Sequence, residues 1–166
     1  MSARVSSGKD SKQDYGSPWP FIRQLKNHFN ITFDLAAHQG NHKCDRWFGP
    51  GGIAENALIE NWSEKIKQAS GEWGYLNPEY NDIDPWYFKC ATESKHGFRA
   101  VSLVPMDTAG WFDHIPGHAG IWHLKGRIKF DGAKESGSKD SALHSWHPDY
   151  VGQFKVWDWK KDQFLI

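Results

Sequence analysis

Short apolar segments of strand-like length alternate along the chain with segments of helical periodicity. The apolar runs are residues 30–37, 72–76, 98–105, 119–130 and 152–159. Apolar residues recur every three or four positions after Pro20, and Asp84 followed by Pro85 is typical of a helix start. This alternation predicts an α/β fold in which helices flank a mainly parallel central sheet. Residues 131–142 are predicted as a polar loop, and 144–150 receive no element.

Length and composition favour one domain. The chain has 166 residues, enough for a substantial core. Residues 1–13 are polar and rich in Ser, which predicts a disordered tail before a single domain over 14–166. Basic and acidic residues balance at 20 each, so net charge indicates no polyanionic partner. Two cysteines and the absence of a membrane-length apolar run favour a cytoplasmic protein without membrane segments.

Three predicted strands run into residues suited to a binding site: Asp34, Asn77 and Pro105. In open α/β sheets, ligands bind outside the carboxyl ends of the strands. Ala36 and Ala37 follow Asp34, and such small residues let a cofactor approach the backbone. The sequence contains neither of the glycine motifs that bind phosphates. A cofactor without phosphates, S-adenosylmethionine above all, therefore suits this turn better than NAD or ATP.

The tetrapeptide Asn77-Pro78-Glu79-Tyr80 carries the candidate catalytic residues. The lone pair of an exocyclic base amine is delocalised into the ring, so the amine is a poor nucleophile. The side-chain oxygen of Asn77 and the backbone carbonyl of Pro78 are two acceptors that can draw the amine toward a tetrahedral shape. Tyr80 offers a flat face to a base that has left the stack. A turn started by Asn-Pro is the alternative explanation.

Six segments in this order resemble those of phage-type DNA N6-adenine methyltransferases, from about Tyr15 to Phe130. They are DYGSP, FDLAAHQGNHKCDRWF, NALIENW, YLNPEY, VSLVPMDTAGWF and LKGRIKF. The resemblance implies a Rossmann-like fold that transfers a methyl group from S-adenosylmethionine to adenine N6 in DNA. It also implies a purpose, which is to protect phage or prophage DNA from host restriction.

The resemblance also implies cofactor contacts. Tyr15, Ser17 and Pro18 stand where the family has an element near the methionine end of the cofactor. Asp34, Ala36 and Ala37 match its next element. The family's acidic residue for the adenine end is replaced by Asn56, with Glu55 beside it.

Glu79 departs from the family, which has a second proline at this position. The two amine acceptors and the ring remain, so the departure leaves two alternatives open. One is a degenerate, weakly active methyltransferase that binds cofactor or DNA without much turnover. The other is methylation of a different planar amine, such as cytosine N4 or an amine in RNA.

Further residues are candidates for substrate contacts. Asp107 and Trp111 either line the base pocket or, respectively, cap a helix and fill the core. Basic residues alternate on a predicted strand and continue into the loop, so they form either a phosphate-contacting ridge or a solvated edge. They are Lys125, Arg127, Lys129, Lys134 and Lys139.

Histidines raise the alternative of a metal site. His38, His42 and Cys44 have spacing that suits zinc only on a helix, and Gly40-Asn41 argues against a helix. His114, His118 and His123 are predicted at the surface. We therefore predict no metal site.

Overall fold

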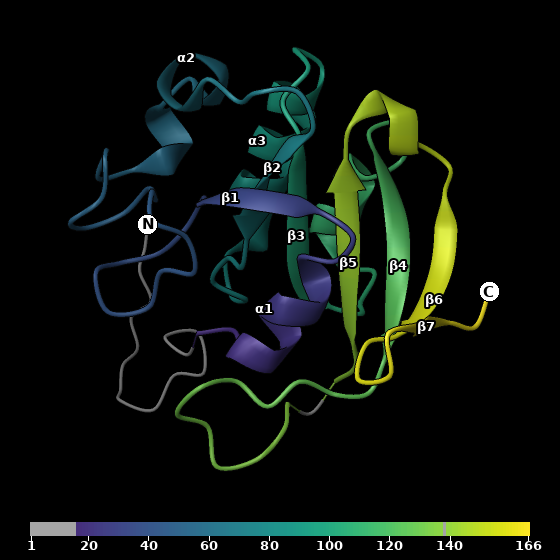
Figure 1. The fold of residues 1–166 in the computed structure, drawn as a ribbon. Helices are drawn as coiled ribbons and strands as arrows, with labels where there is room; N and C mark the ends of the chain where they lie inside the picture. Colours follow the sequence, from purple (N-terminus) through teal and green to yellow (C-terminus); the bar gives the residue numbers. More distant parts are fainter. Residues whose placement is uncertain (1–15, 138) are drawn as a thin grey trace.

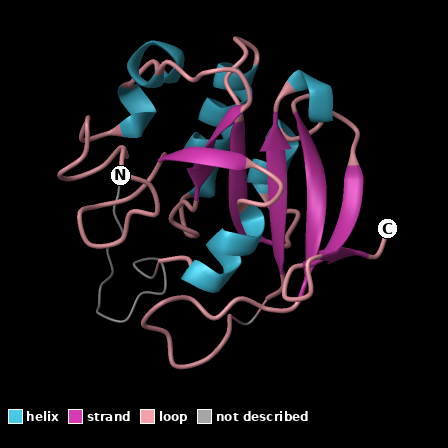
Figure 2. Cartoon of the chain, viewed as in Figure 1, coloured by secondary structure: helices cyan, strands magenta, loops and turns pink. Residues whose placement is uncertain are grey.

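The computed structural model describes residues 16–137 and 139–166, and these form one seven-stranded sheet (Figure 1, Figure 2). The strands are β1 (Asn30–Asp34), β2 (Glu72–Leu76), β3 (Ala100–Pro105), β4 (Ala119–Lys125), β5 (Ser141–Trp146), β6 (Phe154–Asp158) and β7 (Gln163–Phe164). The helices are α1 (Trp19–Leu25), η2 (Ala57–Ile59), α2 (Trp62–Ile66), α3 (Ile83–Ser94), η3 (Gly110–His114) and η4 (Pro148–Tyr150). The predicted tail over 1–13 and Tyr15 lie outside the described residues.

The sheet has the order β1-β2-β3-β5-β4-β6-β7. The pairs β1–β2, β2–β3 and β4–β6 are parallel, whereas β3–β5, β5–β4 and β6–β7 are antiparallel. The prediction of a mainly parallel sheet is therefore not confirmed, and the fold is mixed α/β. Because β5 is antiparallel to both neighbours, β1, β2, β3, β4 and β6 still share one direction.

Like the short elements η4 and β7, strand β5 was not revealed by the sequence. Its sequence, SALHSW, is buried throughout but contains two serines and a histidine, so it lacks an apolar run. Strands on both sides pair with its backbone, and its histidine finds hydrogen-bond partners in the core, whereas the buried Ser145 hydroxyl has none among the described residues. The Tyr87 hydroxyl lies 2.6 Å from His144 Nδ1 and 2.8 Å from Ser102 Oγ. Burial lowers the pKa of His144 to about 3, so this imidazole is neutral.

Two hydrophobic cores cover the two faces of the sheet. On one face, Tyr87 and Cys90 of α3 lie in a cluster with Val104 of β3. On the other, Phe21 of α1 lies in a cluster with Leu103. Neighbouring residues of β3 thus enter opposite cores, as the two-residue period of a strand requires. Figure 1 accordingly shows α1 and α3 on opposite sides of the sheet.

Several element boundaries differ from those predicted. The N-cap of helix α3 is Asp82, which lies two residues before the predicted cap at Asp84. Pro85 therefore lies in the first turn, where its missing N–H leaves no intrahelical hydrogen bond unmade. Strand β4 ends at Lys125, so Arg127 and Lys129 lie in the following loop and not on the predicted strand extension. None of the described helices has the length and apolar character needed to cross a bilayer.

Candidate functional site

The carboxyl ends of β1, β2 and β3 meet at one edge of the sheet. Asp34, the last residue of β1, pairs in register with Tyr75 of β2. Leu76 pairs with Ser102 of β3, and Asn77 follows directly. The parallel arrangement of these three strands thus brings Asp34 and Asn77, which are 43 positions apart in the sequence, to neighbouring strand ends.

Asp34 is a buried carboxylate held by the backbone of its own loop. It is 3% exposed. One oxygen accepts the N–H of Ala36 at 3.3 Å and the other accepts the N–H of Lys43 at 3.0 Å. Burial raises the pKa of Asp34 to about 7, and these two N–H groups only partly offset that effect. Asp34 therefore changes its charge near neutral pH.

The candidate catalytic tetrapeptide is internally bonded. The Tyr80 hydroxyl donates to the side-chain oxygen of Asn77 at 3.1 Å. Burial raises the pKa of Tyr80 well above its ordinary value, so the hydroxyl keeps its proton and remains a donor. The ring of Phe130 meets the Tyr80 ring edge-on, with centroids 5.9 Å apart. Glu79 is only 8% exposed, so the residue that departs from the family pattern lies inside the fold.

The predicted cofactor residues lie in different surroundings. Ser17 is buried, and its hydroxyl lies 2.6 Å from that of Tyr75, beside Asp34 in the sheet. Asn56 accepts the N–H of Leu58 at 3.0 Å and so caps η2, while Glu55 is exposed. Pro18 precedes α1 and is partly exposed.

The turn after Asp34 is closely packed from behind. A Cβ added to Gly49, whose φ is +130°, would lie 1.7 Å from the carbonyl oxygen of Ala37. The Ala37 N–H donates to the Phe48 carbonyl at 3.0 Å. Ala36 and Ala37 are themselves partly exposed. Residue 49 must therefore be glycine for the turn to keep this position.

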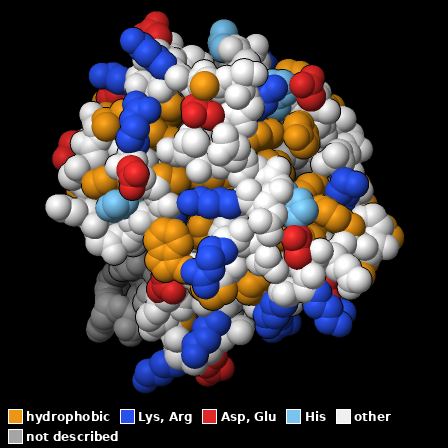
Figure 3. Space-filling view, viewed as in Figure 1, with side chains coloured by type: hydrophobic (Ala, Val, Ile, Leu, Met, Phe, Trp, Pro, Cys, Tyr) orange, Lys and Arg blue, Asp and Glu red, His pale blue; other side chains and the backbone are white. Residues whose placement is uncertain are grey.

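The basic residues predicted to contact DNA fall into two groups. Lys125, Arg127 and Lys139 are paired with carboxylates at 3.5, 3.1 and 2.7 Å; the partners are Asp158, Asp140 and Asp107. Among the described residues, Lys129 and Lys134 are exposed and take part in no ion pair. Figure 3 shows basic side chains along the lower edge of the view, where Figure 1 places the β4–β5 loop.

Asp107 and Trp111 follow β3. The hydrogen bond from Lys139 lowers the pKa of Asp107, which also accepts the N–H of Thr108 at 2.8 Å. Trp111 is 8% exposed, and its ring packs edge-on against Tyr87 at 5.2 Å. Trp111 therefore contributes mainly to the core beneath α3, whereas Asp107 faces the β4–β5 loop.

The histidines near Asp34 are engaged separately. His38 Nδ1 accepts the N–H of Gly40 at 3.0 Å. His42 Nδ1 lies 2.7 Å from the Cys44 carbonyl, and its ring stacks on Trp47 at 3.8 Å. Burial raises the pKa of Cys44 to about 12. Within residues 16–137 and 139–166, no group of three His, Cys, Asp or Glu side chains is placed to hold a metal ion.

Lys43, Phe130 and Asp131 also lie at this site, although the sequence did not single them out. The Lys43 side chain is 6% exposed, and its ammonium lies 3.1 Å from Asp131 Oδ2. Lys43 and Phe130 both belong to segments that resemble the methyltransferase family, and this resemblance was the available signal. The distances that join them to the site depend on the tertiary fold.

A family model described as DNA N-6-adenine-methyltransferase (Dam) matches residues 5–146. This range includes Asp34, the tetrapeptide 77–80, the β4–β5 loop and all of β5. None of the curated proteins gives a significant match to the chain.

Proposed function

The chain belongs to the DNA N-6-adenine-methyltransferase family, and on this premise we propose that it transfers a methyl group from S-adenosylmethionine to adenine N6 in DNA. One domain over 14–166 would carry the activity. The observation that supports the assignment of roles most directly is the 3.1 Å hydrogen bond between Tyr80 and Asn77, at the strand end next to Asp34. It joins the candidate amine acceptor to the candidate stacking ring.

The residues after β1 fit S-adenosylmethionine. Each oxygen of Asp34 accepts one backbone N–H, and a carboxylate has about four acceptor positions. Asp34 can therefore accept further hydrogen bonds from the hydroxyl or ammonium groups of the cofactor. Ala36 and Ala37 provide a small-residue turn, and Ser17 with Pro18 borders Tyr75 on the neighbouring strand. When bound, S-adenosylmethionine supplies an electrophilic methyl group.

The tetrapeptide orients the acceptor amine. An amide oxygen has two lone pairs, so Asn77 can accept a hydrogen from the adenine amine while it keeps the Tyr80 hydroxyl. The Pro78 carbonyl is the second acceptor, and together they favour the nucleophilic shape of the amine. Phe130 fixes the plane of the Tyr80 ring, which can then stack on a flipped base. Positioning thus accounts for most of the expected rate enhancement.

DNA contacts are assigned to the β4–β5 loop and its surroundings. Lys129 and Lys134 form no ion pair within the described chain and can meet phosphates directly, and Lys125, Arg127 and Lys139 can do so by exchanging their carboxylate partners. Asp107 would border the base from the end of β3, and the buried Trp111 would support that side of the pocket from the core beneath α3. The resemblance implies that this methylation protects phage or prophage DNA from host restriction nucleases. The reaction would take place in the cytoplasm of the host cell.

The test is to incubate the protein with S-adenosylmethionine and unmethylated duplex DNA, digest the DNA and analyse the nucleosides by mass spectrometry. The proposal expects N6-methyladenine. N4-methylcytosine, or methylation only when RNA is supplied, would assign the protein to a different amine.

Buried Glu79 is the observation that favours a degenerate, DNA- or cofactor-binding module as the second candidate. Replacing the family's proline removes stiffness next to Pro78, and about 1 Å of misplacement can cost about 100-fold in rate. Glu79→Pro distinguishes the candidates. A gain of about 100-fold or more would identify the natural protein as impaired, and a change below about tenfold would support an active enzyme.

A further inference from the structure

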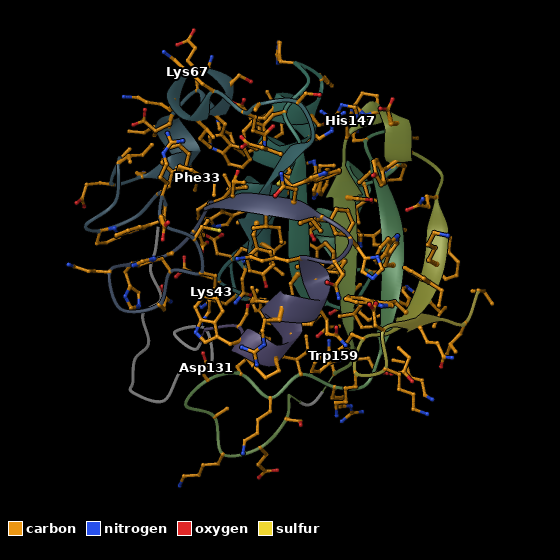
Figure 4. The ribbon with its side chains drawn as sticks, viewed as in Figure 1. Phe33, Lys43, Lys67, Asp131, His147 and Trp159 are labelled. Atoms are coloured by element: carbon orange, nitrogen blue, oxygen red, sulfur yellow. The ribbon has the colours of Figure 1, made fainter. Side chains whose placement is uncertain are left out.

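Lys43 lies where several segments of the chain meet. Its backbone N–H donates to Asp34 at 3.0 Å, and its ammonium lies 3.1 Å from Asp131 in the β4–β5 loop. The same ammonium lies 4.6 Å from the centre of the Trp19 ring at the start of α1. In Figure 4 the labelled Lys43 and Asp131 face one another between their loops. One residue thus touches the cofactor turn, the first helix and the candidate DNA loop.

The position of Lys43 is fixed more firmly than that of a surface lysine. Its side chain is 6% exposed, whereas that of Asp131 is 51% exposed. A buried ammonium is costly unless charged or polar partners compensate it. Asp131 and the face of the Trp19 ring provide that compensation. The loop end of this contact can therefore be altered at the surface without cutting into the core.

The β4–β5 loop is held at two consecutive residues. The N–H of Asp131 donates to the Gly16 carbonyl at 2.9 Å, next to Ser17. Phe130, which is 8% exposed, packs edge-on against Tyr80. The loop is thus anchored on the cofactor side by Asp131 and on the base side by Phe130. Lys129 and Lys134, which form no ion pair among residues 16–137 and 139–166, stand on either side of this anchor in the sequence.

We propose that Lys43 is a positioning residue that couples cofactor binding at Asp34 to DNA binding by the β4–β5 loop. This inference rests on the proposed function. A ligand that engages the Asp34 carboxylate acts on the group that holds the Lys43 backbone, and Lys43 in turn holds Asp131. A bound cofactor then favours the loop position that presents Lys129 and Lys134 to phosphate. Coupling of this kind is reciprocal, so DNA strengthens cofactor binding by the same factor.

The experiment measures the dissociation constant of a fluorescent DNA duplex by anisotropy, with and without saturating S-adenosylhomocysteine. The ratio of the two constants is the coupling factor, for which we expect about tenfold in the natural protein. Asp131→Asn should reduce it to about one, while the affinity for S-adenosylhomocysteine alone, measured by calorimetry, changes less than about threefold. Glu135→Gln is the matched control: it removes one charge from the same loop at an exposed residue that forms no ion pair within the described chain. It should leave the coupling factor unchanged.

A second pair of variants separates coupling from structure. Lys43→Asp should lose the coupling, and adding Asp131→Lys should restore at least half of it by reversing the ion pair. A role of Lys43 that does not depend on its ion pair with Asp131 predicts no such rescue, and unchanged affinity for S-adenosylhomocysteine alone in the double variant separates coupling from a general loss of structure. Full coupling in Asp131→Asn, or equal loss in Glu135→Gln, would overturn the inference while leaving the proposed function intact. A natural protein that binds neither S-adenosylhomocysteine nor DNA would overturn both.

Discussion

The tetrapeptide 77–80 and the β4–β5 loop have opposite character, although Phe130 brings them into contact. The tetrapeptide is partly or fully buried, and its two candidate functional side chains bond to each other. Most side chains of the loop region are exposed, and most of its cations are paired with carboxylates. The first region is therefore shaped by the fold before any substrate arrives. The second must exchange ion-pair partners to bind phosphate, so it should control salt-dependent affinity and leave the chemical step to the first.

Asn77→Ala is the sharpest test of this division. Removing the side-chain acceptor should reduce kcat by at least about 100-fold, the usual cost of losing one preorganised polar group at a reacting centre. Affinities for DNA and for S-adenosylhomocysteine should stay within a few-fold. Single-turnover methylation assays and binding titrations provide the measurements. Tyr80→Phe keeps the ring and loses the hydroxyl, so its loss of rate should be smaller. Unchanged activity in Asn77→Ala would remove Asn77 from its role.

Asp34 extends the buried region to the neighbouring strand, and its charge should control cofactor affinity. Burial raises the pKa of Asp34 from 3.8 to about 7, so the carboxyl is mostly protonated at pH 6 and mostly ionised at pH 8. Because the ionised form accepts more hydrogen bonds, S-adenosylhomocysteine should bind about tenfold more tightly at pH 8 than at pH 6. Calorimetry across this range measures the effect.

The Asp34→Asn variant is the control for that titration, because its side chain is uncharged at both pH values. The Asp34→Asn variant should bind S-adenosylhomocysteine more weakly than the natural protein does, and with little difference between pH 6 and pH 8. A natural protein whose cofactor affinity is flat from pH 6 to pH 8 would contradict this role of Asp34.

The raised pKa of Asp34 also predicts how the free energy of unfolding depends on pH. Between about pH 4 and about pH 7 the folded protein keeps a proton that the unfolded chain releases, so the folded state becomes less stable as the pH rises through this range.

The sequence could predict features that depend on neighbouring residues in the chain, but not features that depend on tertiary contacts. Strand β2 was predicted at its observed bounds because EWGYL is an apolar run that stops at a turn signal, Asn77-Pro78. Strand β5 was missed because His144 and two serines interrupt its apolar run, and the partners of His144 and Trp146 come from α3 and β3, distant in sequence. The tetrapeptide was found from local chemistry. Lys43 was missed because its role depends on contacts with Asp34 and Asp131, which only tertiary structure brings together.

The division of the loop cations into paired and unpaired groups gives a third prediction. Lys129→Ala combined with Lys134→Ala should weaken DNA binding about fivefold and reduce the slope of log affinity against log salt by about 2, one per phosphate contact. The matched double variant, Lys125→Ala with Lys139→Ala, removes two paired lysines and should have a smaller effect. Anisotropy titrations from about 50 to about 300 mM salt, a range that brackets physiological ionic strength, compare the two. Equal losses of DNA affinity in the two double variants would show that ion pairing in the free protein does not determine how much each lysine contributes to DNA binding.

Releasing a paired cation should have the smallest effect, in the opposite direction. Arg127 Nε lies 3.1 Å from Asp140 Oδ1, and both side chains are about half exposed, at 52% and 53%. Asp140→Asn frees Arg127 for phosphate, so DNA binding should tighten about twofold at low salt and by less at high salt. Thermal stability should hardly change, because exposed ion pairs contribute little.

Glu135→Gln separates release of Arg127 from a simple change of net charge. It removes the same single charge from the loop but frees no arginine. Tighter DNA binding in Asp140→Asn but not in Glu135→Gln would show that the carboxylates of this region compete with DNA phosphates for its cations. Equal tightening in both variants would show that the loop acts through its total charge, and the contrast with the bonded pair Asn77 and Tyr80 would then rest on burial alone.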